Sequence, residues 1–255
     1  MKPGIVLKNK INGIDVTLGI LVTDHIWTEL VERSHRAGLD YLIVDMEHGY
    51  HSDQDVARSC QIGRLLQFPV LVRTVSSDPD TVRRALDFGP CGLMFPAIEG
   101  REQLNEIQSA IFLPPRGNRR PGGMGVLWID KYDDETWRLD FENDLIILPQ
   151  IETKRGLDNV EAIVNHEIVT AMAIGPYDLS LSLGFSKDPQ NPEFRKAIQQ
   201  VRQVSIKSGK NTWIMGDGPQ LLEEGFTFLC IGEPSYMLED EFRRRIEAAN
   251  RILNK

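Results

Sequence analysis

The sequence predicts an α/β fold in which a single domain, residues 1–255, forms a (β/α)8 barrel. Three observations favour this fold class. About eight short apolar runs alternate with amphipathic segments, which is the rhythm of a parallel sheet with helices between its strands. A chain of 255 residues has the usual size of such a barrel. Polar side chains follow several of the apolar runs, and parallel barrels bind their ligands at the carboxyl ends of strands.

The expected strands are short runs of branched and aromatic residues, bounded by polar or turn-forming residues. The second run, from Tyr41 to Val44, is followed directly by a cluster of charged residues. In chain order we expect strands at residues 16–22, 41–44, 69–74, 92–98, 145–151, 171–175, 211–215 and 226–231.

Helix signals lie between these runs. Ser52 is the expected N-cap of the second helix, and Gly38 and Gly89 end the first and third helices. The expected helices cover residues 24–37, 53–66, 80–88, 101–111, 156–164, 192–208, 219–224 and 239–253. The region 113–141 breaks the rhythm, because its Pro, Gly and Arg residues favour an irregular loop of the kind that covers a site. Residues 132–141 could form a short helix within it.

A doubly wound open sheet is the other α/β architecture to consider. Such a sheet usually has fewer strands and a glycine-rich first turn. No G-x-G-x-x-G motif follows the first expected strand, and no G-x-x-x-x-G-K-[ST] motif occurs, so nucleotide cofactors are disfavoured. No segment has the composition of a linker, which favours one domain.

Composition restricts the partners and the compartment. The net charge of −8 argues against nucleic acid as the main partner, because duplex binding needs a basic face. The three cysteines have no CxxC spacing and favour a reducing compartment, so we expect a cytoplasmic protein. Residues 1–13 lack the apolar core of a signal peptide, and no run of 18 apolar residues is present, so we expect no membrane association.

Polar residues follow four of the expected strands, and a closed barrel would bring them to one mouth. The second strand is followed by Asp45, Glu47 and His48, the third by Arg73, the fifth by Gln150 and Glu152, and the sixth by Tyr177, Asp178 and Ser180.

Two carboxylates from separate strands, Glu152 and Asp178, suit a hard divalent cation such as magnesium or manganese, with Gln150 nearby. The alternative is that these acids form salt bridges with Lys154 or Arg155. Without thiolates or a pair of histidines, structural zinc fits poorly.

Arg73 ends an apolar strand, where its guanidinium needs a partner. Its planar fork could bind a carboxylate or an enolate oxygen. The alternative is an internal ion pair with Asp45 or Glu47, and both interpretations can hold together. His48 has the right unperturbed pKa for proton transfer near neutrality, and the alternative is an ordinary surface histidine. For Asp45 the alternative is a loop cap.

Two other mechanisms are disfavoured. The expected strands contain no lysine for a Schiff base, and the sequence has no G-x-S-x-G nucleophile elbow. Metal-assisted chemistry on an oxygen-rich anion remains, with a histidine for proton transfer and an arginine for charge.

Six stretches in this order resemble one family: residues 40–49 (DYLIVDMEHG), 69–74 (PVLVRT), 86–89 (LDFG), 113–117 (LPPRG), 148–153 (LPQIET) and 174–180 (IGPYDLS). Together they resemble the HpcH/HpaI group of metal-dependent (class II) pyruvate aldolases, which is typified by 2,4-dihydroxyhept-2-enedioate aldolase and 2-dehydro-3-deoxyglucarate aldolase. That group belongs to the TIM barrels that bind phosphoenolpyruvate or pyruvate. Each motif alone is modest, and the ordered set is specific.

The resemblance implies roles at the matching positions. Glu152 and Asp178 would be the metal ligands, and Arg73 would hold the pyruvate oxygens and stabilise the enolate. His48 would be the acid/base, with Asp45 as its hydrogen-bonding support.

Further positions match the substrate site. Gln150 would make a polar contact near the substrate, and Gly175, Pro176 and Tyr177 would lie in the substrate-binding segment beside the metal aspartate. Asp87 would reach the site of a neighbouring subunit.

The implied reaction is cleavage or formation of a 4-hydroxy-2-oxo acid, giving pyruvate and an aldehyde, with Mg2+, Mn2+ or Co2+ as the cofactor. The implied assembly is a homohexamer built from dimers, with a swapped C-terminal helix. A CoA-ester lyase of the malyl- or citryl-CoA type and an oxaloacetate decarboxylase are alternatives within the superfamily. A barrel that binds 2-oxo acids without catalysis is a further alternative.

The sequence departs from the family pattern around the expected aldehyde position. Arg120 replaces a glycine in the long loop, Glu233 and Pro234 follow the last strand, and Tyr177 stands where smaller residues are common. Arg119 and Arg120 favour an acidic or hydroxylated aldehyde. The departures leave the identity of the aldehyde open and do not affect the metal and pyruvate half.

Overall fold

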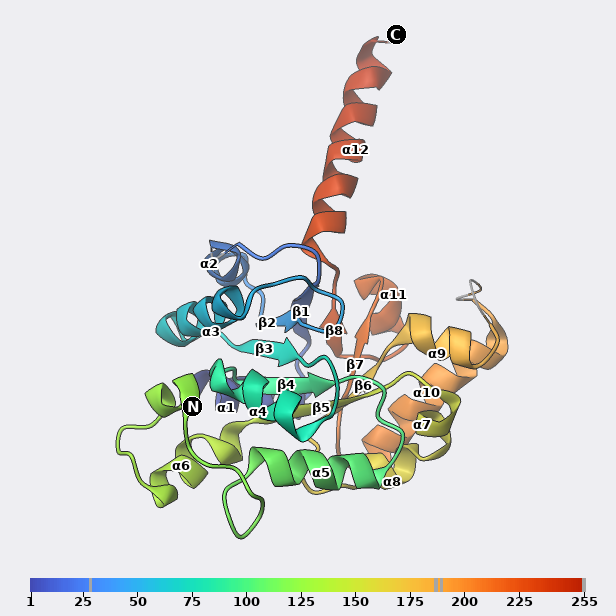
Figure 1. Ribbon diagram of the computed structural model, residues 1–255. Helices are drawn as coiled ribbons and strands as arrows, with labels where there is room; N and C mark the ends of the chain where they lie inside the picture. The colour runs from blue at the N-terminus through green and yellow to red at the C-terminus, as the bar shows by residue number, and fades with distance from the viewer. Residues whose placement is uncertain (28, 186–187, 189, 254–255) are drawn as a thin grey trace.

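The computed structural model describes residues 1–27, 29–185, 188 and 190–253. Eight parallel strands close into one barrel in chain order, and helices surround it (Figure 1). This arrangement confirms the predicted (β/α)8 TIM barrel. The strands are β1 (Thr17–Val22), β2 (Tyr41–Asp45), β3 (Val70–Arg73), β4 (Gly92–Phe95), β5 (Ile146–Ile151), β6 (Met172–Ile174), β7 (Thr212–Met215) and β8 (Phe228–Cys230).

The helices follow the strands in alternation. They are α1 (Lys2–Ile11), α2 (Glu29–Arg36), α3 (Asp53–Leu66), α4 (Pro79–Asp87), α5 (Arg101–Ile111), α6 (Asp134–Asp140), α7 (Lys154–Asp158), α8 (Val160–Val164), α9 (Pro176–Ser182), α10 (Pro192–Lys207), α11 (Gly218–Glu223) and α12 (Pro234–Leu253). Two 3-10 turns, η1 (Gly123–Trp128) and η2 (Glu142–Asp144), lie around α6. The long irregular region therefore contains the short helix expected at 132–141, and Ser52 caps α3 as predicted, because its side chain accepts a hydrogen bond from the Asp55 N–H.

Large side chains fill the amino-terminal half of the barrel. The Tyr41 hydroxyl donates to the Leu229 carbonyl at 2.7 Å, and Trp213 Nε1 donates to the Tyr41 oxygen at 2.8 Å. Gly19 gives this ring its space, since a Cβ at that position would lie 2.4 Å from the Tyr41 ring. The interior is therefore a packed core, and a ligand site has to be built at the carboxyl ends of the strands.

Strand register brings two expected site residues together. In the β2–β3 ladder Asp45 lies directly beside Arg73, each at the end of its strand. In the β5–β6 ladder Gln150 pairs with Ala173, so the residues that follow β5 and β6 also lie side by side. These two ladders define two parts of the barrel mouth, with β4 between them.

Four elements differ from the sequence-based expectation. The chain forms α1 before β1, where no element was expected because apolar residues are few, yet Leu7 and Ile11 of this helix are buried. The helix expected at 156–164 is divided into α7 and α8, and α9 directly follows β6, where no helix was expected. The last helix, α12, begins at Pro234 rather than at residue 239.

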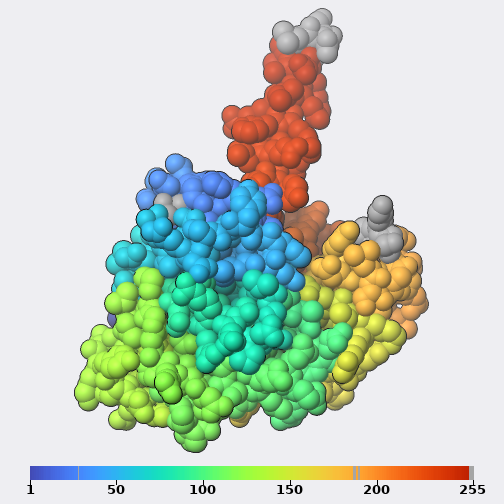
Figure 2. Space-filling model, viewed as in Figure 1, coloured from blue at the N-terminus to red at the C-terminus, as the bar shows by residue number. Residues whose placement is uncertain are grey.

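The helix α12 extends away from the barrel (Figures 1 and 2). Its large apolar side chains are exposed, namely Tyr236, Met237, Leu238, Phe242, Ile246 and Ile252. Within the described part of the chain this apolar surface has no cover. Among the described helices, none is both long enough and apolar enough to cross a membrane.

Candidate active site

A buried ion pair between Asp45 and Arg73 forms the centre of the barrel mouth. Arg73 Nε donates to Asp45 Oδ1 at 2.8 Å, and Nη2 donates to Oδ2 at 2.6 Å. Burial alone would raise the pKa of Asp45, but the hydrogen bonds and charge of Arg73, together with hydrogen bonds from the Glu47 N–H and Thr23, hold this pKa below its usual value. Both groups are therefore charged, and the internal ion pair expected as an alternative for Arg73 is present.

Asp45 has two further donors. The Thr23 hydroxyl donates to Oδ2 at 3.0 Å, and the Glu47 N–H donates to Oδ1 at 2.9 Å. Both carboxylate oxygens of Asp45 are thus occupied by these donors and by Arg73. This result differs from the expectation that Asp45 supports His48.

Glu47 connects the arginine to the histidine. Its carboxylate lies 3.2 Å from Arg73 Nη1 and 3.9 Å from His48 Nε2. Burial raises the pKa of Glu47, with the charges of Arg73 and His48 acting against it. The His48 side chain is 62% exposed, so it can reach a ligand in the mouth. Glu47 was expected only as an alternative ion-pair partner of Arg73, and that pair is present.

A second group of polar residues lies at the ends of β5 and β6. Glu152 is buried, and its Oε2 accepts a hydrogen bond from the Ala97 N–H at 2.8 Å. Burial, followed by the charge of Glu47, raises the pKa of Glu152 to about 7, and the charge of Asp178 adds to this. The carboxylates of Glu47, Glu152 and Asp178 are therefore close enough to repel one another.

Gly175 leaves room for this group. A Cβ on Gly175 would lie 2.5 Å from Glu152 Oε1 and 2.7 Å from Gln150 Nε2. Gln150 is buried, and its Oε1 has no hydrogen-bond partner in the described part of the chain. The residues expected to bind metal and substrate thus lie together, with an amide oxygen available for a ligand.

These donors fit a hard divalent cation. Carboxylate and amide oxygens are the ligands that Mg2+ and Mn2+ prefer, and a cation would relieve the repulsion between the acids. The described residues contain no group of three or more His, Cys, Asp or Glu side chains that could hold an ion. An ion on Glu152 and Asp178 would therefore need oxygens from water and substrate.

Asp87 lies away from this mouth. It is the last residue of α4, which runs from the carboxyl end of β3 back to the amino end of β4. Arg119 donates to Asp87 Oδ1 at 2.9 Å, and the Arg119 side chain is 2% exposed. In its own chain Arg119 therefore binds Asp87 and does not line the mouth.

Glu233, at the start of α12, is another site residue whose environment was not predicted. It is buried, and its Oε2 accepts hydrogen bonds from the N–H groups of Ser235 and Tyr236 at 2.6 and 3.1 Å. This side chain caps α12. Because the sequence predicted that this helix starts at residue 239, the capping by Glu233 was not predicted.

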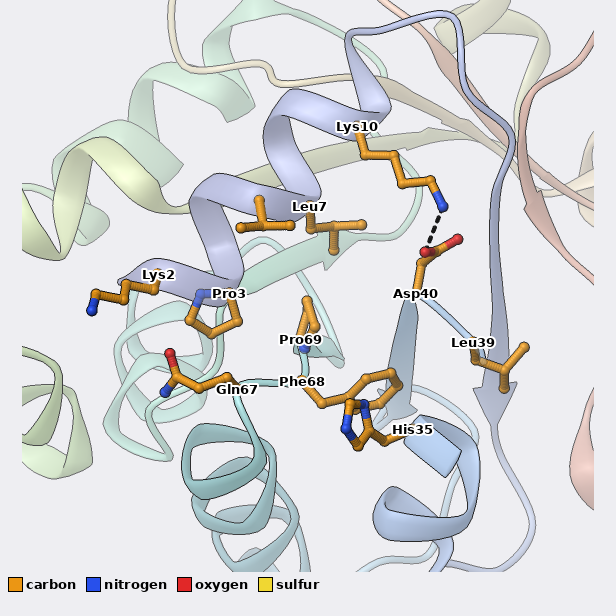
Figure 3. Close-up of a pocket in the computed structure, with 11 residues that line it drawn as sticks. Lys2, Pro3, Leu7, Lys10, His35, Leu39, Asp40, Gln67, Phe68 and Pro69 are labelled. Carbon is orange, nitrogen blue, oxygen red and sulfur yellow. Dashed lines mark hydrogen bonds and ion pairs between the residues drawn. The ribbon is translucent and has the colours of Figure 1, made fainter. Parts of the chain in front are cut away.

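A cavity of about 230 Å³ at the other end of the barrel is a separate feature (Figure 3). Residues of α1, α2 and the end of α3 line it, including Leu7, His35 and Phe68, and Lys10 pairs with Asp40 at its edge at 2.6 Å. None of the expected site residues lines this cavity. We therefore place the candidate active site at the carboxyl ends of the strands.

The raised pKa of Glu152 predicts how the stability of the metal-free protein depends on pH. Below pH 4.5 the group is protonated in both the folded and the unfolded state, whereas near pH 7 and above the folded state bears the cost of a buried charge. Stability should therefore fall as pH rises from 4.5 to 7, and Glu152→Gln should remove this loss. We expect the variant to be about 1–3 kcal/mol more stable than the wild type at pH 8.

Urea unfolding of EDTA-treated protein at several pH values would measure this difference. Glu106→Gln on α5 is the control, because Glu106 is exposed. A stability difference between Glu152→Gln and wild type that stays constant from pH 4.5 to 8 would contradict a raised pKa of Glu152 in the folded protein.

Comparison with known proteins places the chain in a family. Residues 27–229 match the model of the HpcH/HpaI aldolase/citrate lyase family. The chain is 31% identical over 202 residues to a hydroxypyruvate/pyruvate aldolase of Chromohalobacter salexigens, covering 76% of this chain and 78% of the relative. It is 27% identical over 222 residues to a 2-keto-3-deoxy-L-rhamnonate aldolase of Klebsiella pneumoniae, covering 85% and 83% of the two chains.

Solved structures agree in fold. An HpcH/HpaI aldolase/citrate lyase family protein from Burkholderia cenocepacia superposes with a TM-score of 0.86 at 26% identity, covering 96% of this chain and 99% of that one. An HpcH/HpaI aldolase from Desulfitobacterium hafniense gives a TM-score of 0.87 at 24% identity, covering 95% and 96%. With four-fifths of its length matched by the family model, the chain belongs to the HpcH/HpaI aldolase/citrate lyase family.

Proposed function

We propose that the protein is a class II pyruvate aldolase, which cleaves a 4-hydroxy-2-oxo acid to pyruvate and an aldehyde and catalyses the reverse addition. One observation carries the proposal. The buried guanidinium of Arg73, fixed by Asp45 and Glu47, lies in the same barrel mouth as the carboxylates of Glu152 and Asp178. This combination suits a 2-oxo acid whose oxygen becomes negative during the reaction.

Arg73 supplies the fixed positive charge. Burial acts against its charge, but the hydrogen bond with Asp45 raises its pKa above the usual value. Its bonds to Asp45 and Glu47 leave N–H groups on Nη1 and Nη2 for a ligand. Because the fork is already fixed, little reorganisation is needed when an enolate oxygen develops beside it.

His48 is proposed to transfer the proton. For cleavage it would remove the proton of the C4 hydroxyl, the C3–C4 bond would break, and a carbonyl would form at C4. The electron pair of the broken bond would pass to C3 and the 2-oxo oxygen, which gives pyruvate after protonation of C3. Glu47, 3.9 Å from His48 Nε2, would stabilise the protonated ring.

Glu152 and Asp178 are proposed to hold a divalent cation, with Gln150 beside them. Such an ion, Mg2+, Mn2+ or Co2+, supplies Lewis-acid polarisation of the 2-oxo group when it is bound. The backbone at Gly175, Pro176 and Tyr177 would pass beside the carboxylate of the substrate. The names of the relatives, a hydroxypyruvate/pyruvate aldolase and a 2-keto-3-deoxy-L-rhamnonate aldolase, support a 2-oxo acid as the substrate class.

Other activities would use the same groups. A lyase for malyl- or citryl-CoA, an oxaloacetate decarboxylase and a non-catalytic 2-oxo-acid sensor each require a site for the 2-oxo acid or its enolate. The close approach of Glu47 to His48 favours catalysis over sensing, because binding alone does not need a proton-transfer group.

We also propose that copies of this chain assemble through α12, with exchanged helices in a dimer-based hexamer. The exposed apolar residues of α12 support this, together with an apolar groove at its base that is lined by Ile20, Trp27, Leu30, Met237 and Leu238. Asp87, whose carboxylate is 40% exposed, would then reach a neighbouring site.

The proposed partners are small molecules, with no nucleic acid and no membrane. The net charge of −8 supports the first exclusion. Cys60, Cys91 and Cys230 are buried free thiols, which supports a reducing compartment, and we propose the cytoplasm.

The first test is pyruvate release from a panel of 4-hydroxy-2-oxo acids, read with lactate dehydrogenase. We expect release with Mg2+, Mn2+ or Co2+ and loss of at least about a hundredfold in rate after EDTA treatment, since a metal acting as a Lewis acid contributes several kcal/mol. Oxaloacetate and malyl-CoA in the same assay test the related activities. Undiminished release after complete metal removal would contradict the proposed mechanism.

Arg73→Ala tests whether the positive charge of Arg73 contributes to the reaction. We expect kcat to fall by about a hundredfold or more, because a fixed donor to the developing oxyanion is lost. Arg84→Ala is the control, since Arg84 makes an exposed pair with Asp53 at 2.6 Å and should retain activity. Arg73→Lys and a urea unfolding curve would separate loss of charge from loss of fold. Nearly normal kcat in a folded Arg73→Ala protein would remove Arg73 from the mechanism.

Replacing Phe242 and Ile246 of α12 by glutamate tests the assembly. Both side chains are exposed in the single chain, at 55% and 60%, so their burial would come from another copy. We expect sedimentation velocity to show a shift from hexamer to smaller species. Exposed Leu127 on η1, replaced by glutamate, is the control. An unchanged sedimentation coefficient in the α12 variant would contradict assembly through α12.

A further inference from the structure

The helix α9 forms part of the rim of the mouth. It directly follows β6, and Asp178 lies in its first turn. The Ser180 hydroxyl donates to the Tyr177 carbonyl at 2.6 Å, and Ser182 Oγ accepts from the Lys154 N–H at 2.9 Å. The first bond lies within α9, and the second fixes the end of α9 against the segment that follows Glu152.

Tyr177 and Leu181 give α9 an exposed apolar face. Their side chains are 67% and 46% exposed and lie four residues apart, so they are neighbours on one side of the helix. Leu181 is also three residues after Asp178, whose charge adds to the effect of burial in raising the pKa of Glu47 and Glu152. The face that carries Tyr177 and Leu181 therefore adjoins the carboxylates of the mouth.

The charges around this mouth disfavour a second anionic group. Asp45, Glu47, Glu152 and Asp178 provide four carboxylates, and Arg73 is already paired with the first two. Cations in the surrounding loops and helices also have acidic partners: Arg84 with Asp53 at 2.6 Å, Lys154 with Asp158 at 2.5 Å and Arg155 with Glu99 at 3.6 Å. A negative charge on the aldehyde would meet repulsion here.

We propose that Tyr177 is a specificity-determining residue, which selects a neutral aldehyde carrying an apolar or aromatic group. The inference rests on the aldolase function proposed above and names the class of its second substrate. The ring of Tyr177 would pack against the apolar group while the reacting carbonyl lies over the Arg73 side of the mouth. An apolar contact of this size changes kcat/KM by about tenfold or more.

The experiment measures aldol addition of pyruvate to matched pairs of aldehydes. Butanal is compared with 4-oxobutanoate, and benzaldehyde with 4-carboxybenzaldehyde, because each pair differs by one carboxylate. We expect kcat/KM to be at least about tenfold higher for the neutral member of each pair. Tyr177→Ala should reduce this ratio by about tenfold, and Tyr177→Phe should retain it, since the ring makes the contact.

Tyr132→Ala is the matched control, because Tyr132 is 68% exposed and lies in the loop before α6, away from the mouth. The ratio of kcat/KM between the neutral and the carboxylate aldehyde should be the same in Tyr132→Ala as in the wild type. A wild-type preference for the carboxylate member would overturn the inference. A ratio that Tyr177→Ala leaves unchanged would overturn it as well.

Exchange of the pyruvate methyl protons with deuterium, followed by NMR in the presence of metal, separates this inference from the proposed function. This exchange requires the enolate chemistry and no aldehyde. Exchange together with no preference between paired aldehydes would reject the role of Tyr177 and keep the aldolase. Absence of exchange would reject the aldolase, and the inference about its aldehyde with it.

Discussion

The ion pair between Asp45 and Arg73 is the interaction on which the site depends. The two residues end neighbouring strands in direct register, and the backbone therefore sets their contact. Removal of either partner would leave a buried charge uncompensated, which typically costs several kcal/mol. Asp45 also binds Thr23 and the Glu47 N–H, so one carboxylate links β1, the β2 end and β3.

The same pair leaves the mouth with an excess of negative charge. Arg73 is largely neutralised by Asp45 and Glu47, while Glu152 and Asp178 add further acids. Burial, followed by the charges of Glu47 and Asp178, raises the pKa of Glu152 to about 7. Under the function proposed above, a divalent cation held by Glu152 and Asp178 would offset this imbalance. The repulsion between these acids would then favour binding of the ion.

Much of this site could be predicted from the sequence. Strand ends are visible because apolar runs stop at charged residues, and a closed barrel brings such ends together whatever the details of packing. The hydrogen-bond partners of Asp45 and His48 could not be predicted, for a local reason. The β2–β3 register places the guanidinium of Arg73 against both oxygens of Asp45, which leaves Glu47 as the neighbour of His48. Periodicity alone does not give side-chain partners across strands.

Contacts through the long loop were beyond prediction for a different reason. Arg119 reaches Asp87 across 32 residues of sequence, and the fold of an irregular Pro- and Gly-rich segment decides that contact.

The two halves of the site differ in how strongly their side chains depend on one another. The half proposed to bind pyruvate consists of buried charges that hold one another, so a single substitution is costly there. Tyr177 is exposed on a short helix beside that half, and its replacement disturbs no buried partner. A family that keeps one enolate chemistry can therefore change its aldehyde at such rim positions with little loss of stability.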